Sequence, residues 1–196
     1  MAYFTALGDD PYSLAMRKFI NEGNILTDCI RTIEGKRAGL YVVHQENGDH
    51  QFPYWRENSA ARLLADDTQA LSSAIDGADC LYFSGITLAI LEPNRRQDLL
   101  KAIGKARKNN VLVAFDRNIR VSLWPDKSKI IQTLRHAASV SDIVLPTFSD
   151  EATLFSDISQ EQMNARLNGS RPEDTARAGI TMAAAVIRHQ GALIPR

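Results

Sequence analysis

The sequence is poor in cysteine, has no excess of either charge and contains no apolar run long enough to cross a bilayer. Its 196 residues include two cysteines, Cys29 and Cys80, and no Cys-x-x-Cys pair. Isolated cysteines of this kind are mostly structural in a reducing compartment, and Cys80, which begins an apolar run, is predicted to be a small buried side chain. The four histidines have no metal-ligand spacing, so core or solvated roles are expected for them.

The charges balance at 23 basic and 23 acidic residues, for a formal net charge of zero, and no long basic run occurs. The electrostatic signature of a nucleic-acid binder is therefore missing. The first ten residues lack the basic region and apolar core of a signal peptide. We therefore expect a cytoplasmic protein with neither a nucleic acid nor a membrane as partner.

The hydrophobic pattern alternates between strands and helices along most of the chain. A hydrophobic content of 44% is enough for a substantial core. Repeated β-α-β units predict a parallel sheet with helices on both faces. The expected strands are residues 3–7, 29–33, 80–84, 111–115 and 142–145, and the expected helices are 11–21, 68–75, 93–108, 127–138 and one that starts at the capping box of residues 170–173.

A β-rich stretch interrupts this alternation. Residues 39–46 and 50–55 read as strands on either side of Asn47-Gly48-Asp49, a strong hairpin signal because Asn and Gly accept positive φ at low cost. We therefore expect an antiparallel ribbon that is separate from the parallel sheet.

Polar side chains follow the strand at residues 111–115. Asp116, Asn118 and Arg120 come within five residues of its carboxyl end. Ligands of open α/β sheets bind at that edge. A carboxylate, an amide and a guanidinium placed there could orient a polyol and pair with an acid group.

Seven segments in order resemble the ribokinase-like (PfkB) carbohydrate kinases, and within them the kinases of 2-keto-3-deoxygluconate. The resemblance implies an α/β fold, a ribokinase-like parallel sheet with flanking helices plus a small β-sheet lid, here incomplete. It implies one partial kinase domain over residues 1–196, with the lid strands at 27–56 inserted, and phosphorylation of a sugar or sugar acid with ATP and Mg²⁺. The segments are residues 5–13, 39–43, 53–61, 81–91, 115–125, 143–155 and 191–196.

By this resemblance, Tyr41, Tyr54 and Arg56 would contact the substrate from the lid. Arg120 would reach the carboxylate of a sugar acid, and Asn118 would bind beside it. A fork-shaped guanidinium suits a carboxylate better than a neutral hydroxyl, which favours a keto-deoxy sugar acid over fructose or another neutral sugar. The alternative is that the tyrosines only pack in strands and Arg56 is solvated.

The resemblance also implies residues near the nucleotide and Mg²⁺. They are Asp116, Thr147, Asp150 and Glu151; residues 147–150 stand in the place of a family Asn-x-x-Glu motif, and Glu151 comes next. The alternative is that these acids lie at a helix N-terminus and only interact favourably with the helix dipole. Arg117 replaces the family's usual Pro, which predicts a looser loop around Arg120.

The sequence departs from the family in what it lacks. It contains neither a Gly-Gly-Asp sugar motif before residue 5 nor the Gly-Ala-Gly-Asp motif that supplies the anion hole and the catalytic base. Asp76-Gly-Ala-Asp79 precedes a strand and does not replace it. We expect a family member that lacks its first segment and an internal block near residues 160–165, with no catalytic residue of its own.

Three readings follow from the sequence. The first is a sugar kinase homologue that lacks the catalytic segment, the second an inactive sugar-acid binding or dimerisation module, and the third a non-functional remnant. The family's lids often pack together, and a two-stranded ribbon is marginal in water unless it is covered, so a homo-oligomer through the lid is expected.

Overall fold

The computed structural model describes residues 1–46, 49–51 and 53–155. Within it the chain forms two compact units. The first comprises Met1–Ala78 and Ile90–Ala106, and the described part of the second comprises Asp79–Ala89 and residues 107–155. The helix predicted from the capping box at residues 170–173 lies outside the described residues.

The first unit begins with a β-α-β element. Strands β1 (Thr5–Leu7) and β2 (Ile30–Thr32) pair in parallel, and helix α1 (Pro11–Glu22) connects them. The helix begins where predicted because the Asp10 side chain accepts hydrogen bonds from two backbone N–H groups of the first turn, and Pro11 fits the first helical position. Gly23 ends it.

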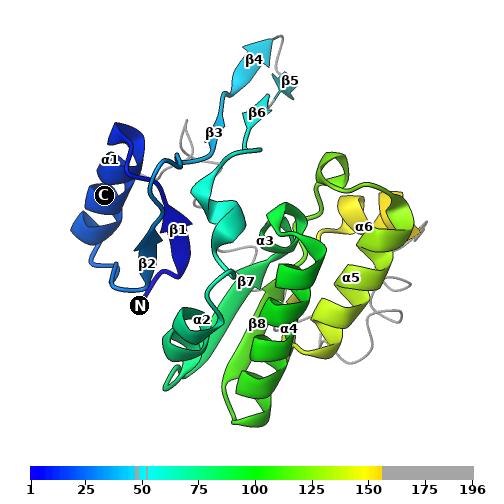
Figure 1. Cartoon of the computed structure of the whole chain (residues 1–196). Helices are drawn as coiled ribbons and strands as arrows, with labels where there is room; N and C mark the ends of the chain where they lie inside the picture. Colours follow the sequence, from blue (N-terminus) through cyan, green and yellow to red (C-terminus); the bar gives the residue numbers. More distant parts are fainter. Residues whose placement is uncertain (47–48, 52, 156–196) are drawn as a thin grey trace. The chain divides into compact units, whose positions relative to one another are not determined.

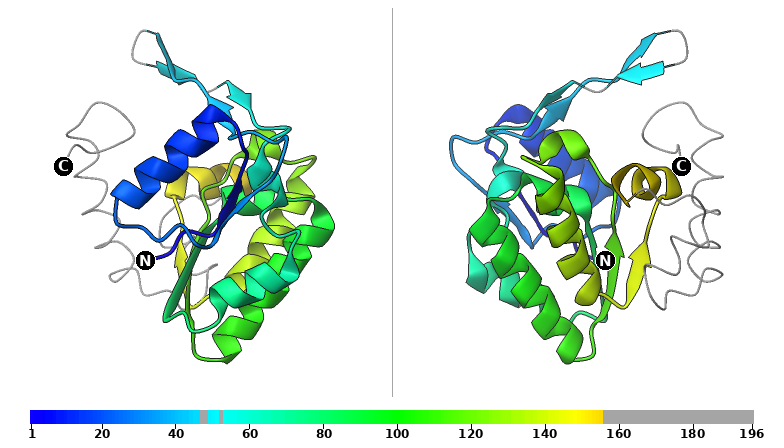
Figure 2. Two further views of the ribbon diagram at one scale, coloured as in Figure 1. Left: turned by 60° about the vertical axis from the view of Figure 1, so that its left-hand side comes forward. Right: turned by 90° about the vertical axis from the view of Figure 1, so that its right-hand side faces the viewer.

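The predicted ribbon is present as two short antiparallel ladders. Strand β3 (Leu40–Tyr41) pairs with β6 (Tyr54–Trp55), and β4 (His44–Glu46) pairs with β5 (Asp49–Gln51). The ribbon extends away from β1, β2 and α1 (Figures 1 and 2). The turn residues Asn47 and Gly48 lie outside the described part of the chain, and Asp49 begins β5.

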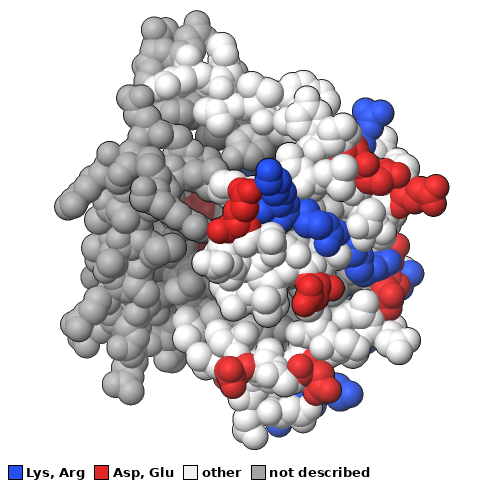
Figure 3. All heavy atoms as spheres, turned by 90° about the vertical axis from the view of Figure 1, so that its left-hand side faces the viewer, with Lys and Arg blue, Asp and Glu red and all other residues white. Residues whose placement is uncertain are grey.

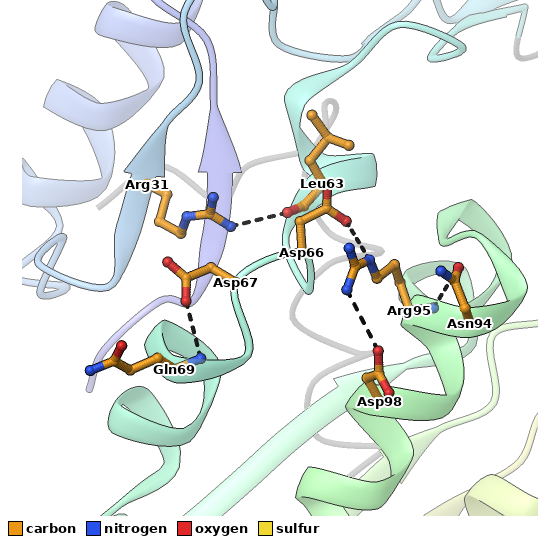
Figure 4. A network of polar contacts seen from close by, with 8 residues as sticks. All are labelled: Arg31, Leu63, Asp66, Asp67, Gln69, Asn94, Arg95 and Asp98. Atoms are coloured by element: carbon orange, nitrogen blue, oxygen red, sulfur yellow. Dashed lines mark hydrogen bonds and ion pairs between the residues drawn. The ribbon is translucent and has the colours of Figure 1, made fainter.

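The rest of the first unit is helical, and charged side chains connect its helices and turns to one another and to β2. It contains a 3₁₀ turn (Ala60–Leu63), α2 (Thr68–Ile75) and α4 (Pro93–Lys108), which continues into the second unit at its last residues. Arg95 Nε lies 3.0 Å from Asp66 Oδ1 and its Nη1 lies 3.7 Å from Asp98 Oδ2 (Figure 4). Arg31 donates to the Leu63 carbonyl at 3.2 Å. The Arg95–Asp66 pair joins α4 to the segment after the 3₁₀ turn, and the Arg31 contact joins that turn to β2.

The second unit is built on a three-stranded parallel sheet. Its order is β7 (Cys80–Ser84), β8 (Leu112–Asp116) and β9 (Ile143–Leu145). Phe83 and Phe115 stack with ring centroids 4.7 Å apart, and Val113 beside them is fully buried. Helix α5 (Lys127–Ser139) lies along one face, as Figures 1 and 2 show. Its buried side chains are Ile130, Leu134 and Ala137.

Three short elements were not predicted, and one prediction was wrong. The elements are the 3₁₀ turn at Ala60–Leu63, α3 (Gly85–Ile90) and a second 3₁₀ turn (Val121–Leu123). Helix α6 (Phe148–Phe155) begins where the sequence offered a helix N-terminus as the alternative. Cys80 is exposed rather than buried. The reason is strand alternation, because Phe83 occupies the buried face and Cys80 shares the opposite face with Tyr82, which is also exposed.

Charges of both signs are mixed on the surface. On the face drawn in Figure 3, acidic side chains lie beside basic ones, and several basic side chains follow one another in a line across the face. No described helix has both the length and the apolar character that a membrane span requires.

Candidate functional site

Asp116 occupies the edge position that the sequence predicted. It is the last residue of β8, at the carboxyl end of the sheet. Tyr82, on the neighbouring strand, donates its hydroxyl to Asp116 Oδ2 at 3.0 Å. Burial of the phenol, together with the charge and hydrogen bond of Asp116, raises the pKa of Tyr82 to about 12. The carboxylate thus has a fixed donor, and sequence reasoning did not single out Tyr82.

The loop after β8 presents Asn118 and Arg120. Asn118 adopts a positive φ of 30°, which turns the chain sharply. Ile119 is buried, and its N–H donates to Asp150 Oδ2 at 3.3 Å. Arg120 is exposed and donates to the Ile119 carbonyl at 3.3 Å. The loop therefore anchors one apolar side chain and leaves the guanidinium at the surface.

Arg117 does not loosen this loop, contrary to the expectation from the missing Pro. Its side chain is 2% exposed, and its Nε lies 2.7 Å from Glu151 Oε1, whose side chain is 0% exposed. The guanidinium also lies 5.1 Å from the centre of the Phe155 ring. A buried charge needs a partner of opposite sign, and Glu151 is that partner for Arg117. Arg117 is thus an anchor that the sequence did not reveal.

The three residues near the start of α6 have different environments. Thr147 is exposed, and its carbonyl accepts the Glu151 N–H at 3.1 Å. Asp150 holds the Ile119 N–H, and Glu151 is buried against Arg117. Both acids lie in the first turn of α6, where the helix dipole favours a negative charge.

The lid residues form a cluster of their own in the first unit. Tyr41 and Tyr54 are direct partners in the β3–β6 ladder, with ring centroids 6.0 Å apart. The Arg56 guanidinium carbon lies 4.2 Å from the Tyr54 ring centre and 5.7 Å from that of Tyr41. Such stacking is attractive and fixes the plane of the guanidinium.

The predicted residues therefore fall into two groups, each within its own unit. The lid cluster is Tyr41, Tyr54 and Arg56. The sheet-edge group is Asp116, Asn118, Arg120, Thr147, Asp150 and Glu151.

The described residues do not fit a Mg²⁺ site. In the part of the chain that the structure describes, no three acidic, histidine or cysteine side chains gather as metal ligands. Glu151 is engaged by Arg117, and Asp150 by the Ile119 N–H.

Comparison with known proteins identifies the family. The family model of pfkB family carbohydrate kinases matches residues 1–168. The 2-dehydro-3-deoxygluconokinase of Dickeya dadantii is 33% identical over 171 residues, which cover 86% of this chain and 55% of that protein. The fructokinase of Vibrio alginolyticus is 28% identical over 155 residues, which cover 79% of this chain and 48% of that one.

A solved structure shares the fold. The sugar kinase PH1459 from Pyrococcus horikoshii in complex with ATP superposes with a TM-score of 0.67 at 22% identity, covering 79% of this chain and 50% of that one. The likeness confirms the ribokinase-like α/β fold that the sequence predicted. The chain spans about half the length of the curated relatives it matches. By the family model and its relatives, the chain belongs to the pfkB family of carbohydrate kinases.

Proposed function

We propose that this chain binds a keto-deoxy sugar acid of the 2-keto-3-deoxygluconate (2-dehydro-3-deoxygluconate) type, as the substrate-binding part of a sugar-acid kinase. The relatives at 31–33% identity that carry the name 2-dehydro-3-deoxygluconokinase support this substrate class. The chain itself supplies side chains with the matching chemistry.

The observation that carries the proposal is the stacking of Arg56 on Tyr54, with Tyr41 alongside. A guanidinium stacked on a ring face keeps its N–H donors in the guanidinium plane, where they can bind oxygen atoms. Tyr41 is 41% exposed, so the cluster is open to solvent. An aromatic and cationic surface of this kind suits a sugar with acidic or hydroxyl oxygens.

The sheet-edge loop presents a cation of its own. Arg120 is exposed on a loop whose backbone is held by Asp150 and by the buried Ile119. A guanidinium can bind a carboxylate through two parallel hydrogen bonds, and a neutral sugar has no equivalent group. Asn118, two residues earlier, would add an amide. This is the reason for preferring a sugar acid.

We do not expect these 196 residues to transfer a phosphoryl group by themselves. The 196 residues contain no Gly-Ala-Gly-Asp motif for the anion hole and general base. ATP and Mg²⁺ are the co-substrate and metal that the family implies, and binding of ATP stays a proposal. We also propose a homo-oligomer that forms through the lid, a cytoplasmic location, and a kinase domain whose lid comprises residues 27–56.

A neutral sugar is the second candidate substrate, because fructokinases at 28–30% identity are also among the relatives. Titration calorimetry of the 196-residue chain with 2-keto-3-deoxygluconate and with fructose separates the two. We expect binding of the acid to exceed that of fructose. Stronger fructose binding would favour the second candidate, and no binding of either sugar would overturn the proposal.

Arg120→Ala tests the assignment within the same experiment. A charge-assisted hydrogen bond is worth roughly 1.5–3 kcal/mol, so the affinity for the acid should fall about ten- to a hundredfold. Arg120→Lys should recover only part of it. Arg135→Ala, on the exposed side of α5, is the matched control and should bind as the wild type does. Unchanged binding in Arg120→Ala would show that Arg120 only caps the loop.

A further inference from the structure

The loop at residues 116–120 carries three predicted site residues, and Arg117 between them points into the protein. Its Nε lies 2.7 Å from Glu151 Oε1, with side-chain exposures of 2% and 0%. Glu151 belongs to α6, thirty-four positions later in the chain. The pair thus joins the loop to a helix outside the sheet.

The backbone at Arg117 is fixed on two further sides. Its N–H donates to the Leu145 carbonyl at 3.2 Å, which extends the pairing of β8 with β9 by one residue. Its carbonyl packs against Gly85, where a Cβ would lie 1.9 Å from the Arg117 oxygen. The peptide after Asp116 is therefore held by a strand, a helix start and an ion pair.

A second contact from α6 follows within two residues. Asn118 turns the chain with its positive φ, and the Ile119 N–H then meets Asp150 Oδ2 at 3.3 Å. Asp150 and Glu151 are adjacent, so one turn of α6 holds the loop at two points. Displacing α6 would move both contacts together, and the exposed Arg120 with them.

A buried ion pair adds little to the free energy of unfolding compared with apolar side chains of the same volume. Removing two charges from water offsets much of their attraction, and apolar replacements of similar volume are often as stable. What the pair adds is a fixed partner, because the Arg117 guanidinium is held 2.7 Å from a carboxylate on α6. The Phe155 ring, 5.1 Å from the guanidinium carbon, is a second neighbour on the same helix.

We propose that Arg117 and Glu151 are positioning residues for the sugar-acid site, which hold the loop so that Asn118 and Arg120 face the substrate carboxylate. The inference rests on the proposed function for its ligand. Its structural content, the position of the loop, can be measured without one.

The test is the double variant Arg117→Met/Glu151→Met, which removes the pair without leaving a buried charge. Hydrogen exchange at the Ile119 amide reports the loop, and the amides of β8 report the sheet. We expect Ile119 to exchange at least about tenfold faster while β8 stays protected. We also expect affinity for 2-keto-3-deoxygluconate to fall about tenfold or more, with fructose affinity unchanged, because only the acid uses Arg120.

The control variant is Arg62→Met/Glu92→Met, which removes a surface pair of 3.0 Å in the first unit. It should leave both readouts unchanged. If the double variant retains wild-type exchange at Ile119, the inference is overturned whatever the binding result. If Ile119 is released but the wild-type chain binds no sugar acid, the positioning role stands and the proposed function fails.

A second variant keeps the inference testable if the double variant does not fold. Arg117→Lys keeps the charge but not the planar fork, so the fold should persist. Ile119 should then exchange at a rate between those of the wild type and a freely exposed amide. Wild-type exchange at Ile119 in this variant would also overturn the inference.

Discussion

The Tyr82 hydroxyl donates a hydrogen bond to Asp116 Oδ2, 3.0 Å away, across the parallel strands β7 and β8. Tyr82 lies on the outward face of the sheet, and Asp116 is the last residue of its strand. The contact fixes the carboxylate at the edge where the candidate site begins. Burial of the phenol raises the pKa of Tyr82, and the nearby Asp116 charge adds to the shift because one negative charge opposes a second.

Replacement of Asp116 by Asn should lower the pKa of Tyr82 from about 12 toward the ordinary value of 10. Because the folded pKa lies above the unfolded one, Tyr82 contributes stability below pH 10 and loses it as the pH rises from 10 to about 12. The measurement is tyrosinate absorbance against pH, taken as the difference between each protein and its Tyr82→Phe counterpart. An unchanged titration in Asp116→Asn would contradict the contact.

Asp142 should make stability sensitive to acid. Burial alone would raise its pKa, but the hydrogen bonds from Arg107 at 2.8 Å and from the Val113 N–H at 2.9 Å, with the Arg107 charge, hold it below the ordinary 3.8. The folded pKa is thus depressed, so the stabilisation is complete above pH 3.8 and is lost as the pH falls below it. The pair is partly exposed, so about 1 kcal/mol or less is expected.

The measurement for Asp142 is urea unfolding of the wild type and Asp142→Asn at pH 7 and near pH 3. The wild type should be more stable at pH 7, and the difference should shrink at low pH because the wild-type carboxyl becomes protonated. The same difference at both pH values would assign the effect to packing instead.

Much of the fold was predictable because its signals are local. Asp10, Pro11 and Gly23 are adjacent to the helix ends that they specify, and α1 runs from Pro11 to Glu22 as expected within one residue. The helices Thr68–Ile75 and Pro93–Lys108 and the strand Cys80–Ser84 have the predicted bounds. Helix α3 was missed because its six residues, GITLAI, are too few for a helical period to appear.

The contacts of the candidate site were less predictable because they join distant positions. Alternation places Asp116 at a strand end, but nothing in the sequence pairs Arg117 with Glu151, and isolated charges are usually expected at the surface. Tyr82 could have been found. It alternates with the buried Phe83 on a strand beside β8, which directs it to the other face of the sheet.

The exposed ribbon should carry the contact between subunits. Leu40, Val42 and Val43 are 46–56% exposed on it, and a short ribbon of this kind is marginal in water without cover. Val42→Asp should therefore shift a dimer toward monomer in light scattering. Thr68→Asp, on the exposed start of α2, is a control for added charge and should leave the mass unchanged. A wild-type monomer whose ribbon amides are protected from exchange would refute the dimer.

The 196-residue chain should not phosphorylate 2-keto-3-deoxygluconate. Loss of a general base alone typically costs about 10²–10⁴ in rate, and the sequence lacks the Gly-Ala-Gly-Asp segment that would provide both base and anion hole. The assay is ADP release in the presence of ATP, Mg²⁺ and the sugar acid, with binding measured on the same preparation. Robust turnover would show that another group of this chain acts as the base.

Gly85→Ala should damage the sheet-edge loop, and Gly39→Ala should not. A Cβ on Gly85 would lie 1.9 Å from the backbone oxygen of Arg117, so either α3 or the loop must move. Forcing extra volume into a packed site costs about 1–3 kcal/mol, and a backbone neighbour cannot rotate away as a side chain can. At Gly39 the nearest atom would be the Ser59 Cβ at 3.4 Å, an ordinary contact. Urea unfolding of both variants, with exchange at Ile119, separates them. Equal stability of the two proteins would mean that the Arg117 carbonyl does not approach Gly85 in solution.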